Sequence, residues 1–158
     1  MTTIFKLLKE DHEKHRDLLE KISNTSGDSE DRRTLFEQFR TEVTAHANAE
    51  EQSLYGTMLK DPDLQDEGRH SVAEHKEIDD FLGELQEMDM SGSAWLSKFK
   101  EMRHRYEHHI DEEEEDMFPE AKEELTHEQA KKMGEKFEDR KPAEVELAKE
   151  SASGDTRE

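Results

Sequence analysis

The sequence predicts an all-α protein: an up-down four-helix bundle of two pseudo-symmetric helical hairpins, with a short C-terminal helix. Four segments carry apolar residues at steps of three or four, which is the spacing of one helix face. The second half of the chain also repeats the first, because 63 residues separate His12 from His75 and His46 from His109. Val, Ile and Thr are sparse, which disfavours a sheet-rich fold. We assign residues 1–141 to the bundle with its appended helix and residues 142–158 to a frayed tail.

The first helix is expected over residues 2–23, where Ile4, Leu8, Leu19 and Ile22 form an apolar stripe. His12 and His15 fall on this stripe, at positions where leucine would be expected. The polar residues that follow predict a turn, with Asp28 or Ser29 capping the next helix.

The second helix is predicted to run from about residue 31 to residue 60. Its inner stripe is Phe36, Phe39, Val43, His46, Glu50, Leu54 and Met58. His46 and Glu50 therefore face the core rather than the solvent. Asp61 and Pro62 are expected to end this helix and begin the next, with Asp61 as the N-cap.

The third helix carries the stripe Val72, His75, Ile78, Asp79, Leu82 and Leu85. The fourth, capped by Ser93, carries Trp95, Phe99, Met102, Tyr106, His109, Glu113 and Met117. Pro119 is expected to end or kink it. Thr126 and Gln129 then predict a capping box for a short helix with Ala130, Met133 and Phe137 as its apolar face, which Pro142 interrupts.

Six inward-facing residues match across the repeat: His12, His46 and Glu50 in the first half, and His75, His109 and Glu113 in the second. If a quasi-two-fold axis relates the hairpins, all six converge at one level of the core. Ionised glutamates there would carry a desolvation cost of several kcal/mol each unless they were paired or metal-bound. The pattern therefore predicts a dinuclear metal site. Imidazole with carboxylate suits iron or zinc, and manganese is an alternative.

The other histidines and acids have weaker support from the repeat. His15 aligns with Ile78, so we expect a core or supporting role for it. Four histidines without a repeat partner are expected on the surface or around the site: His70, His104, His108 and His127. A solvated face beside the site is predicted for Glu112, Glu114, Glu115 and Asp116. Glu51 and Glu114 match across the repeat but lie off the main stripe.

Composition limits the classes of partner and of chemistry that we expect for this protein. The formal net charge of −20 disfavours nucleic acid and anionic membranes, which select for Lys and Arg. The absence of cysteine excludes disulfides, thiolate metal sites and thiol catalysis. No apolar run approaches the roughly 18 residues of a membrane helix, and the N-terminus lacks a signal-peptide pattern, so we expect a cytoplasmic protein.

At these residues the chain resembles the hemerythrin-like (HHE cation-binding) family over about residues 4–125. The matching motifs are DH at Asp11-His12, HANAE at His46 to Glu50, EH at Glu74-His75, and HIDEE through MFP at His109 to Pro119. The resemblance implies a non-heme centre of two iron ions. It implies that Glu50 and Glu113 bridge the irons, with His12 and His46 on one iron and His75 and His109 on the other.

The chain departs from the oxygen-carrying hemerythrins at Asp79, where those proteins have a further histidine. Three roles for Asp79 stay open: a metal ligand through its carboxylate, a ligand through water, or an acceptor that orients His75.

Three function classes follow. The first is a protein that binds O2 or NO for storage, delivery or sensing, with a separate protein partner in the case of a sensor. The second is a redox enzyme acting on peroxide, nitric oxide or ferrous iron. The third is an interaction bundle without a working metal.

Overall fold

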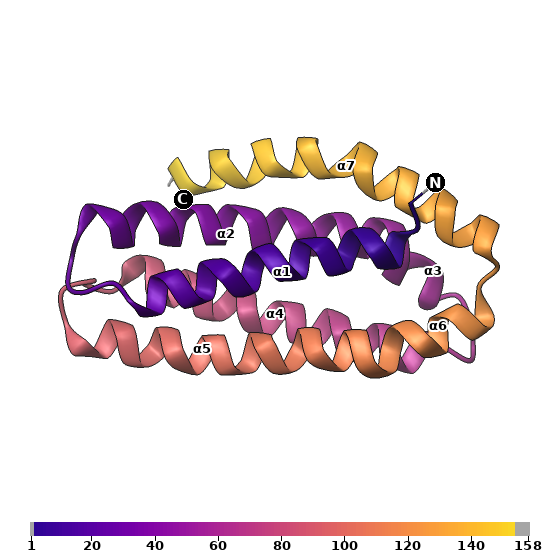
Figure 1. Cartoon of the computed structure of the whole chain (residues 1–158), viewed down its shortest axis with the longest axis horizontal. Helices are drawn as coiled ribbons and strands as arrows, with labels where there is room; N and C mark the ends of the chain where they lie inside the picture. The colour runs from indigo at the N-terminus through magenta and orange to yellow at the C-terminus, as the bar shows by residue number, and fades with distance from the viewer. Residues whose placement is uncertain (1, 154–158) are drawn as a thin grey trace.

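The long helices of this computed structural model, which describes residues 2–153, form a bundle (Figure 1). They are α1 (Ile4–Ser23), α2 (Glu30–Glu50), α4 (Gln65–Glu87) and α5 (Ser93–Glu112). α1 contacts α2 and α5, and α4 contacts α5 and α2, so each of these helices has two neighbours within the bundle. The structure confirms the predicted all-α four-helix bundle of two hairpins.

The second helix of each hairpin changes its winding at matching points of the repeat. α2 continues into the π-helix η1 (Glu51–Tyr55) and then α3 (Gly56–Met58). α5 continues into η2 (Glu113–Met117) and then α6 (Phe118–Glu124). The second helix predicted over about residues 31–60 is confirmed as a helical path from Glu30 to Met58, but its π-helical turn was not predicted. A π-turn inserts an extra residue, which redirects the side chains that follow, and such turns are frequent at functional sites.

Two of the four predicted helix starts differ from the structure. Ser29 caps α2 as expected, because its hydroxyl accepts the Arg32 backbone N–H at 3.1 Å. Asp61 instead closes a turn by accepting the backbone N–H of Asp63, and α4 begins later, at Gln65. Gly92 occupies the cap position of α5, so Ser93 is the first helical residue.

α7 (His127–Ser153) is much longer than predicted. Its capping box is confirmed, since Thr126 and Gln129 exchange hydrogen bonds of 2.8 and 3.0 Å. The helix continues through Pro142, however, so a short helix followed by a frayed tail from residue 142 is wrong. Arg40 of α2 donates to the carbonyl of Ala148 at 2.8 Å, and such contacts offset the backbone bond that proline cannot make. Residues 154–158 lie outside the described part.

The core consists of two apolar clusters with a polar layer between them. One cluster includes Leu8, Leu54 and Phe118, and the other includes Leu19 and Phe99. Along each bundle helix the inward histidines lie between the residues of these clusters. The polar layer is therefore enclosed from both ends of the bundle. Within residues 2–153, no helix is long and apolar enough to cross a membrane.

Candidate metal centre

Six buried side chains form the polar layer. His12 comes from α1, His46 and Glu50 from α2, His75 from α4, His109 from α5 and Glu113 from the start of η2. The spacing of four residues in each His-x-x-x-Glu motif puts both side chains on one helix face. The structure therefore brings together all six residues that the repeat singled out.

Each glutamate lies between one histidine of each hairpin. Glu113 Oε1 is 3.0 Å from His12 Nε2, and Glu113 Oε2 is 3.9 Å from His109 Nε2. Glu50 Oε1 is 3.4 Å from His46 Nε2 and 3.3 Å from His75 Nε2. Ligand atoms of His12, His46 and Glu113 lie within 4.8 Å of one another, as do those of His75, His109 and Glu113. Both groups are close enough to hold a metal ion.

Several atoms of this layer have no hydrogen-bond partner although they are fully buried. They are both oxygens of Glu50, Oε1 of Glu113 and Nε2 of His12. The distances between these atoms are short, but their geometry is not that of a hydrogen bond. Buried polar atoms without partners are rare and costly in proteins. A pair of cations would satisfy these atoms, so the residues present fit a dinuclear metal centre.

In each of the four histidines of the layer, the ring nitrogen Nδ1 donates a hydrogen bond to a carboxylate. The Nδ1–H groups of His12, His46, His75 and His109 donate to Glu114 at 2.7 Å, Asp11 at 2.9 Å, Glu51 at 2.9 Å and Glu74 at 2.6 Å, respectively. Such a contact fixes the ring orientation and tautomer and leaves Nε2 free for a metal.

The four supporting acids obey the same repeat as the histidines. Asp11 and Glu74 are 63 residues apart, and so are Glu51 and Glu114. Sequence analysis placed Glu114 on a solvated face and left Glu51 without a role. The repeat itself was the signal that could have assigned both, because each acid matches across it together with its histidine.

The family model of the hemerythrin HHE cation binding domain matches residues 3–121. The chain belongs to this family. A solved structure of an HHE cation-binding-domain protein from Mycobacterium kansasii is similar to this chain, with 28% sequence identity and a TM-score of 0.84. The similarity covers 99% of this chain and 96% of that one. A comparison with curated proteins finds no match. Family, fold and side-chain clusters together support metal binding.

In this HHE domain, the ionisation of the centre follows from its contacts. Burial alone would lower the pKa values of His12 and His75. Contacts with Glu113 and Glu114 raise the pKa of His12 to about 9, and contacts with Glu50 and Glu51 raise that of His75 to about 10. The metal-free centre therefore holds protons that metal binding must displace.

Two tyrosines and His15 surround the layer. Sequence analysis placed Tyr106 on the inner stripe of its helix and assigned Tyr55 no role. The Tyr55 hydroxyl donates to Glu113 Oε2. Tyr106 and His15 share a hydrogen bond of 2.7 Å between the phenol oxygen and Nδ1. Burial and neighbouring His46 hold the pKa of His15 well below its usual range, so this ring is neutral. His15 supports the centre from beside His46, in line with its expected role.

Asp79 is not brought to the centre. It is exposed and belongs to none of the candidate metal clusters found among the described residues. Glu51 already accepts the hydrogen bond from Nδ1 of His75. Asp79 would need that same nitrogen as its donor if it were to orient the His75 ring. Asp79 instead lines a small gap of about 20 Å³ between α2 and α4, together with His46 and His75.

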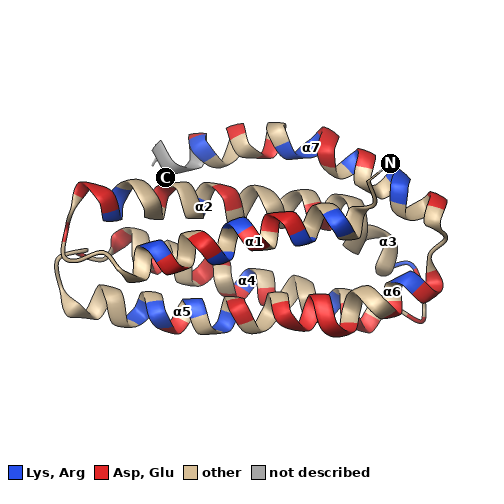
Figure 2. Ribbon diagram, viewed as in Figure 1, with Lys and Arg blue, Asp and Glu red and all other residues tan. Residues whose placement is uncertain are grey.

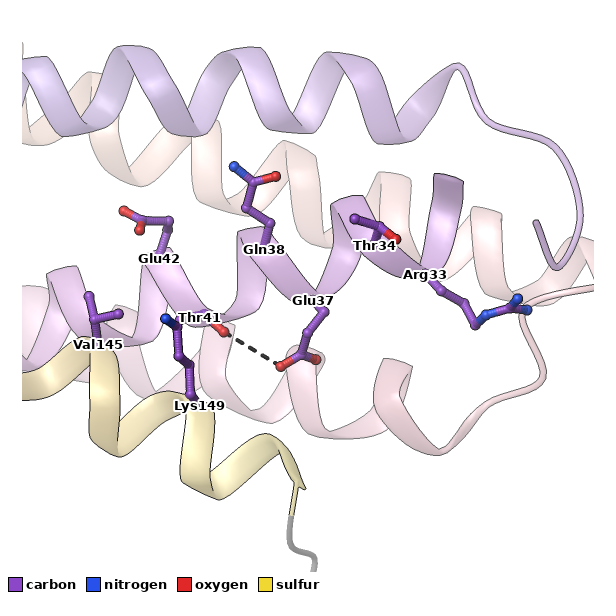
Figure 3. Close-up of a pocket in the computed structure, with 8 residues that line it drawn as sticks. All are labelled: Arg33, Thr34, Glu37, Gln38, Thr41, Glu42, Val145 and Lys149. Carbon is purple, nitrogen blue, oxygen red and sulfur yellow. Dashed lines mark hydrogen bonds between the residues drawn. The ribbon is translucent and has the colours of Figure 1, made fainter. Parts of the chain in front are cut away.

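A larger pocket, of about 760 Å³, lies between α2 and the end of α7 (Figure 3). Its lining residues are Arg33, Thr34, Glu37, Gln38, Thr41, Glu42, Val145 and Lys149. None of them is a histidine or a member of the polar layer, so this pocket is separate from the metal centre.

Proposed function

We propose that the chain is a non-heme di-iron protein that binds O2 or NO for storage, delivery or sensing. The observation that carries the proposal is the symmetric layer of four histidines around two buried glutamates with unsatisfied oxygens. His12 and His46 would hold one iron and His75 and His109 the other, with Glu50 and Glu113 between them. Reduced iron supplies the electrons for reversible binding of a diatomic gas. Manganese and zinc are the alternatives that metal analysis tests.

The surroundings favour a very small ligand. Buried apolar side chains, among them Val43, Ile78 and Leu82, form part of the lining of the gap of about 20 Å³ beside His46 and His75. A volume of this order accommodates about one water-sized molecule. It suits a diatomic ligand, because an organic substrate would need several of these buried side chains to move.

The protein's own residues would control protons around the bound ligand. Tyr55 donates to Glu113 and stays protonated, because burial and the nearby Glu113 and Glu50 raise its pKa well above the usual value. The neutral His15 and Tyr106 form a second buried hydrogen-bonding pair. Both pairs are buried, so the hydrogen-bonding groups beside the centre are held away from bulk water.

The test is anaerobic loading with ferrous iron, measurement of iron per chain, and addition of O2 under a spectrophotometer. The proposal expects two irons per chain and a visible absorption band that disappears when O2 is removed. Direct conversion to a stable ferric state, with no reversible band, contradicts gas binding.

A redox enzyme acting on peroxide, nitric oxide or ferrous iron is the second candidate. It is favoured by a pocket of about 260 Å³ that runs from exposed Asp66 and His70 to buried His109 and Glu113. Such a pocket can admit peroxide or a hydrated cation. Steady-state turnover above that of free iron supports the enzyme, and its absence with all three substrates excludes it.

A further inference from the structure

A second group of metal-binding side chains lies outside the centre, on the outer face between α4 and α5. His70 Nε2 is 3.2 Å from Glu74 Oε2 and 3.3 Å from Glu112 Oε1. Their ligand atoms lie within 4.8 Å of one another, as in the buried groups. His108 adds a fourth donor nearby, because its Nε2 is 3.5 Å from Glu112 Oε2. Imidazole with carboxylate is a ligand set for a divalent transition metal.

This face collects three of the four histidines that have no partner in the repeat. His70, His104 and His108 all line one surface pocket of about 440 Å³. Sequence spacing alone assigned them no role. Their gathering on one face, beside the acids of α4 and α5, is a property of the folded chain.

Glu74 connects this face with the buried centre. Its Oε1 accepts the Nδ1–H of His109, while its Oε2 faces His70. Below them lies the pocket of about 260 Å³ whose lining passes from exposed His70 to buried Glu113. A cation held at His70 is thus at the mouth of a passage that ends at the candidate bridging glutamate.

The matching face of the other hairpin is closed. The residues 63 positions before His70 and Glu112 are Leu7 and Ala49, neither of which can bind a metal. α7 covers that face: its Lys141 Nζ lies 2.8 Å from Asp11, the repeat counterpart of Glu74. The ring of Phe137, also on α7, packs 5.8 Å from that of His46.

Negative charge is concentrated around the open face. Acidic residues crowd the second half of α5 and the segment that follows it (Figure 2). Burial is the largest cause that raises the pKa of Glu67 to about 7, and the negative charges of the neighbouring Glu120 and Asp116 add to it. Surfaces of one charge sign increase the local concentration of the opposite ion.

We propose that His70, Glu74 and Glu112 form a mononuclear site for a divalent transition metal, through which the ion reaches the buried centre. The delivery role rests on the proposed dinuclear centre, whereas binding at the surface site does not. The ion exchanges water for the imidazole of His70 and the two carboxylates, then moves inward toward Glu113 without any change of oxidation state.

Two measurements test the proposal. Titration of the metal-free protein with Co2+ alone, followed by visible absorption, is expected to give three ions per chain, the third binding most weakly. His70→Leu, which installs the residue of the covered face, should remove that third ion. Anaerobic Fe2+ uptake by the centre, followed by stopped flow, should be slowed about tenfold in His70→Leu, with two irons still bound at the end. Glu112→Gln should behave in the same way.

His127→Leu is the matched control, because His127 is an exposed histidine at the start of α7, away from this face. It should change neither the ion count nor the uptake rate. The surface site is overturned if wild type and His70→Leu bind equal numbers of Co2+. The delivery role is overturned if both take up Fe2+ at equal rates. If the protein binds one Co2+ that depends on His70 but not two further ions, the surface site is supported and the dinuclear centre is refuted. Failure of the surface site and failure of the dinuclear centre therefore give different results.

Discussion

Replacement of Glu51 by glutamine tests whether the outer carboxylates control metal affinity. Glu51 accepts the Nδ1–H of His75 at 2.9 Å, and its side chain is 37% exposed. Glutamine keeps the size of the side chain and can still accept a hydrogen bond through its carbonyl oxygen. The substitution therefore removes the charge of the acceptor and leaves the His75 ring in place.

A hydrogen bond to a charged group contributes about 1.5 to 3 kcal/mol. Water reaches more than a third of the Glu51 side chain, so the lower end of that range applies, which is about tenfold in affinity. Loss of an outer partner of a metal-binding histidine typically weakens affinity by about 10- to 100-fold. We therefore expect Glu51→Gln to weaken metal binding by about tenfold. Asp11→Asn should cost more, because the Asp11 side chain is 9% exposed.

The assay is competition for metal with a chromophoric chelator, with thermal unfolding of the metal-free protein as a check on folding. Glu10→Gln is the control, because Glu10 is an exposed acid and its substitution makes the same change in net charge. The reasoning is refuted if Glu51→Gln and Glu10→Gln have equal metal affinity. It is also refuted if the loss of affinity is matched by loss of the fold.

Three further predictions concern the centre and the packing around it. Glu50→Ala or Glu113→Ala should lose at least one metal per chain, and two metals retained in both variants would exclude bridging. The folded-state pKa of His75, about 10, exceeds its ordinary value of 6.5, so its stabilisation of the metal-free protein is full below about pH 6.5 and lost as pH rises through 10. Melting temperatures that stay level from pH 7 to 10 would contradict this. Gly134→Ala should destabilise by about 1 to 3 kcal/mol, because its Cβ would lie 2.8 Å from backbone. Gly83→Ala, in open space, should stabilise by about 0.5 to 1 kcal/mol, and equal urea midpoints for the two variants would disprove the packing argument.

The six residues of the buried layer were predictable because the helical period and the repeat constrain the same positions. His46 and Glu50 are one turn apart on a helix whose other inward residues are apolar, so their direction follows from the stripe. Asp79 shows the limit of this reasoning. It is one turn from His75 and shares the same stripe, yet a step of four residues rotates a side chain by about 40°. Helix packing decides which of the two faces the centre.

The course of α7 was mispredicted for a related reason. Pro142 lacks a backbone N–H to donate, and the local sequence around a proline therefore predicts the end of a helix. The packing of α7 on α2 adds stabilisation that no local pattern contains, such as the bond from Arg40 to Ala148. Residues far apart in the chain make these contacts, so their effect cannot be read from a window around the proline.

The sequence by itself determined the fold class, the family and the six inward residues, because periodicity and repetition are properties of the chain. Only the tertiary structure decided that four acids hold the four histidines, that Asp79 stays outside, and that α7 covers one face of the bundle while the face with His70 stays open. Those facts depend on distances between helices. The relative rotation and docking of helices set these distances, and the linear pattern leaves both open.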